Sequence, residues 1–197
     1  MRAIRILLLL AAVAMAAPAA TISLNFSSQS LVVGQTFTVD VYVSDVFGGF
    51  DVLTDSLTGF GANSFIDTPS AVQFVSVGVG SLFDDFSGSF GGNPQVAGLA
   101  SDLDGLQDGE FTEPLLLFTM TFQAIGAGTA NVGLESDLGD PNQGLLITRV
   151  ILDPFSIENL QVDLDQSGRV DISDVPEPAT WLMLVSVLGL LAVRRLR

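Results

Sequence analysis

The sequence has 197 residues, 48% of them hydrophobic, and it contains no cysteine and no histidine. Residues 21–175 hold 21 of the 22 acidic residues but only two of the seven arginines, and lysine is absent, so this stretch has a net charge of −19. These counts exclude disulfides, metal sites built on thiolate or imidazole, lysine Schiff bases, and triads that use histidine or cysteine. They also exclude nucleic acid as an expected partner, because binding it requires basic side chains that neutralise phosphates. A metal ion would need oxygen ligands, which points to calcium.

The first 20 residues have the three parts of a secretory signal peptide. Arg2 and Arg5 give a positive start, residues 6–13 form an apolar run, and residues 16–20 are small residues suited to cleavage. The alternative is a buried N-terminal helix, but such a helix would carry polar side chains on one face and this segment has none. We therefore expect a signal helix that directs export.

Residues 21–160 alternate between apolar and polar positions in short runs separated by glycine-rich turns. The odd positions from 37 to 43 are all apolar, which predicts a half-buried strand over residues 36–44. In residues 115–124 the alternation assigns Leu117 to the face opposite Phe118, Met120 and Phe122. Further strands are expected over residues 21–26, 71–77, 129–134 and 145–152. Short strands separated by glycine-containing turns predict an all-β, antiparallel sandwich.

Part of this pattern resembles the cohesin family. The resemblance rests on residues 31–43, then 49–52, then 72–77, and on a late hairpin formed by residues 117–124 and 126–129. It implies a jelly-roll sandwich over residues 21–160, in a family related to carbohydrate-binding modules. Residues 53–69 depart from the family, since they are longer and richer in glycine than the compact strand pair expected there. Partner-binding residues of the family are therefore not carried over.

Residues 163–174 have the ligand spacing of an EF-hand calcium loop. Gly168 stands at position 6, where such loops turn sharply, and the backbone carbonyl of Arg169 would be the ligand at position 7. The side-chain ligands at positions 1, 3, 5, 9 and 12 would be Asp163, Asp165, Ser167, Asp171 and Asp174. The segment resembles a single dockerin loop, although dockerins carry two such repeats. The alternative is an acidic linker over residues 161–175, followed at once by Pro176, which prevents a full exiting helix.

A second acidic cluster lies in the middle of the chain and consists of Asp102, Asp104, Asp108 and Glu110. It could be a calcium loop between strands, but a solvated loop is favoured because acidic residues are abundant throughout this chain. The same abundance makes a pair of catalytic carboxylates for glycoside hydrolysis a weak hypothesis. We therefore do not expect an enzyme.

The C-terminal residues 176–197 combine a proline-rich motif, an apolar run and a basic end. Residues 181–193 would form a helix of about 20 Å, shorter than the roughly 30 Å hydrocarbon core of a bilayer. The motif is Pro176, Glu177 and Pro178, and the basic residues are Arg194, Arg195 and Arg197. This order resembles the PEP-CTERM sorting signal of Gram-negative bacteria, which implies an exosortase-type processing enzyme as a partner. The alternative is an amphipathic core helix, which the near absence of polar positions disfavours.

These segments give four expected parts: a signal peptide (1–20), a cohesin-like sandwich (21–160), an acidic loop or linker (161–175) and a sorting tail with a short transmembrane helix (176–197). The tail predicts a transient stay in the inner membrane, followed by the cell surface or extracellular matrix. We expect a structural or adhesive protein of biofilm or exopolysaccharide, whose partner is a polysaccharide or another surface protein. The alternative is a calcium-dependent carbohydrate-binding module.

Overall fold

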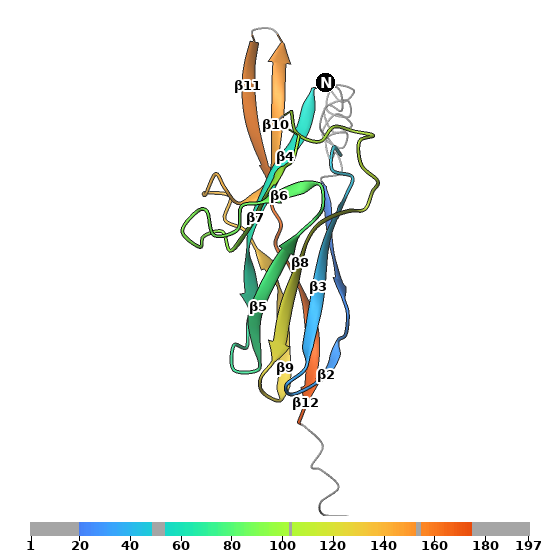
Figure 1. The fold of residues 1–197 in the computed structure, drawn as a ribbon, viewed down its shortest axis with the longest axis vertical. Helices are drawn as coiled ribbons and strands as arrows, with labels where there is room; N and C mark the ends of the chain where they lie inside the picture. Colours follow the sequence, from blue (N-terminus) through green and yellow to red (C-terminus); the bar gives the residue numbers. More distant parts are fainter. Residues whose placement is uncertain (1–19, 49–53, 103, 153–154, 175–197) are drawn as a thin grey trace, which may run out of the picture.

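The computed structural model describes residues 20–48, 54–102, 104–152 and 155–174. These ranges form strands grouped into two sheets, so the expected all-β sandwich is confirmed (Figure 1). The strands are β1 (Thr21–Phe26), β2 (Ser30–Val32), β3 (Thr36–Ser44), β4 (Asp55–Ile66), β5 (Val72–Val79), β6 (Phe83–Asp85), β7 (Val96–Ala100), β8 (Leu115–Ala124), β9 (Gly128–Glu135), β10 (Gly144–Leu152), β11 (Phe155–Val162) and β12 (Gln166–Ser173). Within the described ranges, no helical segment has the length and apolarity that a membrane crossing demands. The expected signal peptide and sorting tail lie outside these ranges.

The smaller sheet has the order β1-β3-β8-β5, and its strands pair antiparallel. In β3 the four apolar side chains at positions 37 to 43 are all buried, as the alternation predicts. The prediction for Leu117 was wrong, because this side chain is fully buried beside Phe118. The reason is an irregularity in the register: Val41 pairs with Phe118, but the next residue, Tyr42, pairs with Leu116. A bulge of this kind turns two successive side chains to the same face.

The larger sheet has the order β11-β10-β4-β9-β12-β2, with β7 also paired to β4 and β6 paired to β7. Its organising element is β4, which pairs with β10 through residues 55–61 and with β9 through residues 63–66. β12 pairs antiparallel with β9 and parallel with β2, so this sheet is mixed. The last two strands, β11 and β12, belong to the sheet. The expected domain boundary at residue 160 was therefore wrong, and the sandwich continues to residue 173.

Aromatic side chains fill the space between the two sheets. Phe60 on β4 stacks on Phe118 of β8 at a centroid distance of 5.1 Å, which joins the larger sheet to the smaller one. Phe83 contacts the edge of Phe60 at 5.0 Å, and Phe37 stacks on Phe122 at 5.5 Å. All five rings are buried. Burial of such rings dominates the hydrophobic stabilisation of a core, and the offset and edge contacts add a smaller term.

An ion pair with a buried carboxylate joins two strands of the larger sheet. Asp55 at the start of β4 is 2% exposed, and it lies opposite Arg149 in the register of β4 and β10. The guanidinium donates twice to the carboxylate, from Nε to Oδ1 at 2.9 Å and from Nη2 to Oδ2 at 2.8 Å. This two-point geometry fixes the orientation of both groups, and it holds the first half of β4 against β10.

Amide side chains hold the loops next to β4. Gln143 is 2% exposed and lies in the connection between β9 and β10. Its Oε1 accepts from the backbone N–H of Asp137 at 3.0 Å, and its Nε2 donates to Oδ1 of Asn93 at 3.1 Å. Gln161 of β11 donates from Nε2 to the backbone carbonyl of Gln143 at 2.8 Å. The network satisfies a buried amide, and it ties three separate segments together.

Candidate binding groove

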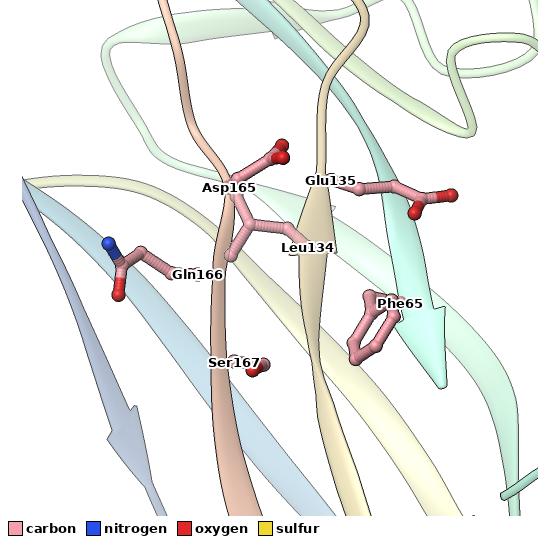
Figure 2. Close-up of a pocket in the computed structure, with 6 residues that line it drawn as sticks. All are labelled: Phe65, Leu134, Glu135, Asp165, Gln166 and Ser167. Atoms are coloured by element: carbon pink, nitrogen blue, oxygen red, sulfur yellow. The ribbon is translucent and has the colours of Figure 1, made fainter. Parts of the chain in front are cut away.

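A groove of about 390 Å³ opens on the larger sheet where β4, β9 and β12 lie side by side (Figure 2). The residues that line it are Phe65, Leu134, Glu135, Asp165, Gln166 and Ser167. We call it the acidic groove. Figure 2 shows Phe65 projecting from β4 on one side, Ser167 on β12 and Asp165 directly before that strand on the other, and Glu135 extending from β9 at one end. An aromatic ring and two carboxylates therefore border one hollow.

The hollow exists because of a glycine in the middle strand. Gly133 of β9 pairs with Phe65 of β4 and with Ser167 of β12, so the three residues form one row across the sheet. A side chain at position 133 would fill the space between the ring and the hydroxyl. A Cβ there would also overlap the backbone carbonyl of Gln166. The neighbouring Leu134 also borders the groove, but its side chain is buried and belongs to the hydrophobic core.

The acidic end of the groove is held by Ser136. Its backbone N–H donates to Oδ1 of Asp165 at 2.6 Å, and its hydroxyl donates to Oδ1 of Asp163 at 2.9 Å. The backbone N–H of Asp165 donates to the same Oδ1 of Asp163 at 3.0 Å. This last hydrogen bond is the main cause that lowers the pKa of Asp163, with the Ser136 hydroxyl acting in the same direction and burial opposing both. The Asp163 carboxylate thus stays ionised at neutral pH.

The expected calcium loop does not form in this fold, because most of its residues belong to β12. Asp171 lies five positions beyond Gln166 on this strand, about 17 Å away at roughly 3.3 Å per residue, so it is far from Asp163 and Asp165. Asp171 instead accepts from Arg169, with Nη2 to Oδ1 at 2.8 Å, and from Thr129. This contact with Arg169 is the main cause that lowers the pKa of Asp171. Asp174 follows the end of β12. Across the described ranges, no group of three acidic side chains is placed to hold a metal ion.

Gly168 has a different role from the one that the loop spacing indicates. It lies within β12, and it is not one of the glycines with a positive φ. A Cβ at this position would lie against the ring of Phe26 from β1. Glycine is therefore needed so that the ring of β1 can pack over β12, and not for a sharp turn.

The second acidic cluster borders a shallow hollow of about 800 Å³ near β6. Asp102, Asp104 and Glu110 line it, and Asp108 does not. Two of these carboxylates accept hydrogen bonds inside their own turns, from the N–H of Asp104 to Asp102 and from the N–H of Gln107 to Glu110. Such bonds are typical of solvated turns, as expected from the sequence.

The sequence prediction did not identify the groove. Of the expected calcium ligands, Asp165 and Ser167 line it, whereas Phe65, Gly133 and Glu135 were missed. The missed residues come from strands far apart in sequence, and only the register of β4, β9 and β12 brings them together. The expected sorting residues Pro176, Glu177, Pro178, Arg194, Arg195 and Arg197 lie outside the described ranges.

No protein-family model matches the chain, and no curated protein matches it. Solved structures similar to it include a cohesin module of a family 33 glycoside hydrolase from Clostridium perfringens, at 12% identity over 80% of this chain and 97% of that module, with a TM-score of 0.47. A type II cohesin domain from the cellulosome of Acetivibrio cellulolyticus is 12% identical over 78% of this chain and 95% of its own, with a TM-score of 0.47. A type I cohesin from Pseudobacteroides cellulosolvens is 10% identical over 80% and 95%, with a TM-score of 0.45. At these identities the likeness concerns the fold alone.

Proposed function

We propose that the chain is an exported, non-enzymatic binding module of the cell surface, and that its acidic groove takes an arginine or lysine side chain of a partner protein. The observation that supports this most directly is the row Phe65, Gly133 and Ser167, with the carboxylates of Glu135 and Asp165 at one end. A hollow with one apolar wall and two acids suits a side chain with an aliphatic stem and a cationic head.

The two walls of the groove would contact different parts of a basic side chain. The stem of an arginine can cover the Phe65 ring, where a guanidinium over the ring face gains about 0.5–1 kcal/mol at an exposed site. Its donors can then reach Glu135 or Asp165, since charge-assisted hydrogen bonds to carboxylates are the stronger kind. The net charge of −19 over residues 21–175 attracts a basic partner from a distance and raises the rate of encounter.

The test is a binding measurement with a defined probe. A panel of short synthetic peptides, each with a central arginine flanked by neutral residues, is titrated into the full-length protein and into its variants. We expect Glu135→Gln and Asp165→Asn each to weaken binding by about 1 kcal/mol, roughly fivefold, and to reduce the dependence on salt. Asp104→Asn, which removes an equal charge from the hollow near β6, is the matched control. Equal losses in all three variants would mean that only the overall charge attracts the peptides.

Export supports the same proposal from the sequence. The signal peptide over residues 1–20 and the tail over residues 176–197 resemble segments that send proteins out of the cytoplasm and to an exosortase-type enzyme. We propose that the sandwich acts in adhesion within the surface layer or matrix, after the tail has been processed. Deleting residues 176–197 is expected to abolish surface attachment in a host that has such an enzyme. Unchanged attachment would contradict this part of the proposal.

A second candidate function is carbohydrate binding, and one observation favours it. Phe86 and Phe90, in the glycine-rich connection between β6 and β7, are 36% and 39% exposed. Exposed rings are a usual platform for sugars. A glycan array, read with and without EDTA, tests this candidate. If the protein is retained on a glycan and the variants Phe86→Ala and Phe90→Ala are not, the result would favour sugar binding over a protein partner. Loss of that retention in EDTA would add a requirement for calcium.

A further inference from the structure

β11 forms one outer edge of the larger sheet. It pairs with β10 through eight consecutive residue pairs without an irregularity. Its other side faces no described strand. The outer ends of β10 and β11 project beyond the sandwich at the top of Figure 1. An edge of this length presents a row of backbone N–H and C=O groups that can pair with another strand.

Among the residues that the structure describes, the other outer strands of this sheet are protected against edge pairing, and β11 is not. β2 and β6 are three residues long, and β6 carries Asp84 and Asp85. Short length and charge are two devices by which natural proteins prevent pairing at an edge. β11 has eight residues, and its one charged residue, Glu158, lies opposite Arg149 of β10. Its Ile157 side chain is 62% exposed.

The sequence of β11 can pair with itself in an antiparallel register. When the twofold axis passes through Asn159, that residue lies opposite its own copy, Ile157 lies opposite Gln161, and Glu158 lies opposite Leu160. No acid then faces an acid, whereas an axis through Glu158 would place two carboxylates directly opposite each other, which is destabilising. We propose that two copies of this chain associate through β11, centred on Asn159, so that their larger sheets form one continuous sheet.

The partner is inferred to be a second copy because the edge strand can pair with itself and carries a single charge, Glu158, in a strongly acidic molecule. Two copies, each with a net charge of −19 over residues 21–175, repel each other at a distance. Salt screens that repulsion without weakening backbone hydrogen bonds at the edge. Pairing of copies therefore becomes stronger as salt rises, which is the opposite of the salt dependence expected for a basic peptide in the acidic groove.

The absence of cysteine from the sequence allows a direct test of the register. In the full-length protein, Asn159→Cys places one thiol on the proposed axis, and Ser156→Cys places one at another exposed position of the same strand. Opposite Cβ atoms in an antiparallel pair lie about 4.5–5.5 Å apart, so we expect disulfide-linked dimers to form roughly tenfold faster with N159C than with S156C. Raising the salt concentration should increase the N159C dimer. Adding Ile157→Glu to N159C should lower it, because the change puts a charge on the edge.

Equal cross-linking rates for N159C and S156C would overturn the proposed register. A decrease in the amount of dimer as salt rises would overturn β11 as the contact between copies. A single strand pair buries less area than a standard protein interface, so the association is expected to be weak and dependent on concentration. Far-ultraviolet circular dichroism of each variant checks that the strand content is unchanged.

Discussion

The two sheets of this sandwich differ in the side chains that they place outside the core. In the smaller sheet, β3 alternates between buried apolar and outward polar side chains, β8 does the same from Phe118 onward, and the outer row is neutral except for Asp40, which accepts from Thr119 at 2.7 Å. In the larger sheet, β4 pairs with three strands, a carboxylate is buried at position 55, and the acidic groove and the open edge of β11 interrupt the surface. The smaller sheet mainly supplies the core. The larger one combines core residues with the features that can bind partners.

The strongest test of this contrast compares two phenylalanines. Phe122 is fully buried between the rings of β3 and β5, so Phe122→Ala should lower the free energy of unfolding by about 3–5 kcal/mol. Phe65→Ala should cost much less, because its ring is partly exposed at the groove, and it should weaken peptide binding instead. Urea unfolding of the full-length protein and the peptide titration measure the two effects. Similar stability losses in both variants would remove the contrast.

The next largest effect is expected at the ion pair of the larger sheet. Asp55→Ala should lower the free energy of unfolding by about 2–3 kcal/mol, somewhat less than for a fully buried pair because the Arg149 side chain is 30% exposed. Asp171→Ala is the matched control, since it removes an exposed partner of Arg169 and should cost less than about 1 kcal/mol. Both are read from urea midpoints. A cost at Asp55 as small as at Asp171 would show that the buried pair does not hold β4.

A smaller effect is expected where the two sheets meet at Phe26 and Gly168. Gly168→Ala puts a methyl group against the Phe26 ring, which should cost about 1–3 kcal/mol of stability by overpacking. Combining it with Phe26→Ala should recover part of that loss, because the ring that causes the clash is removed. If residues 163–174 formed a calcium loop, the result would differ. Gly168→Ala would then change calcium binding, and adding Phe26→Ala would not restore stability. Thermal unfolding with and without calcium distinguishes the two.

The smallest effect concerns acid pH and Asp163. Its folded pKa lies below its ordinary value, so the carboxylate stabilises the fold fully above pH 4 or so, and this stabilisation is lost as pH falls through the folded pKa. Asp163→Asn should therefore be less stable than the native chain at neutral pH, by less than about 1 kcal/mol because the group is exposed. The difference should close at low pH. A difference that stays constant with pH would assign the effect to packing.

The strands of the smaller sheet could be predicted because each buries one face. Period-two alternation in β3 predicts both its bounds and its buried side chains, and the same signal identifies β1, β5 and β8. Two register shifts were missed, one next to Leu117 in β8 and one between Phe74 and Ser76 in β5, because a register shift depends on the partner strand as well as on the local sequence.

β4 could not be predicted in the same way. Its first half is covered on both faces, so the alternation disappears, and glycines that look like turn signals lie inside the strand. Gly61 is needed there because a Cβ would overlap the backbone carbonyl of Asn142. A glycine placed for close approach and a glycine placed for a turn look identical in a sequence.

β12 was misread because its polar positions match a calcium loop. The sequence also contained a weaker signal for a strand. Val170 and Ile172 alternate with Arg169 and Asp171, and both apolar side chains are buried. Ligand spacing in a chain this acidic arises readily, whereas alternation depends on burial. The groove itself needed the structure, because its row of Phe65, Gly133 and Ser167 is defined by pairing between strands.

The position of β12 also has a mechanical consequence. The strand begins beside the groove at Gln166 and ends at Ser173, directly before the segment that leads to the proposed tail. A pull on the chain beyond Asp174, resisted by a partner held in the groove, would act along the strand axis. The hydrogen bonds to β9 and β2 would then be loaded in shear, so that they share the force and do not break one after another. Tension between an anchored tail and a bound partner would be carried by one strand and its two neighbours, while the aromatic core stays outside the line of force.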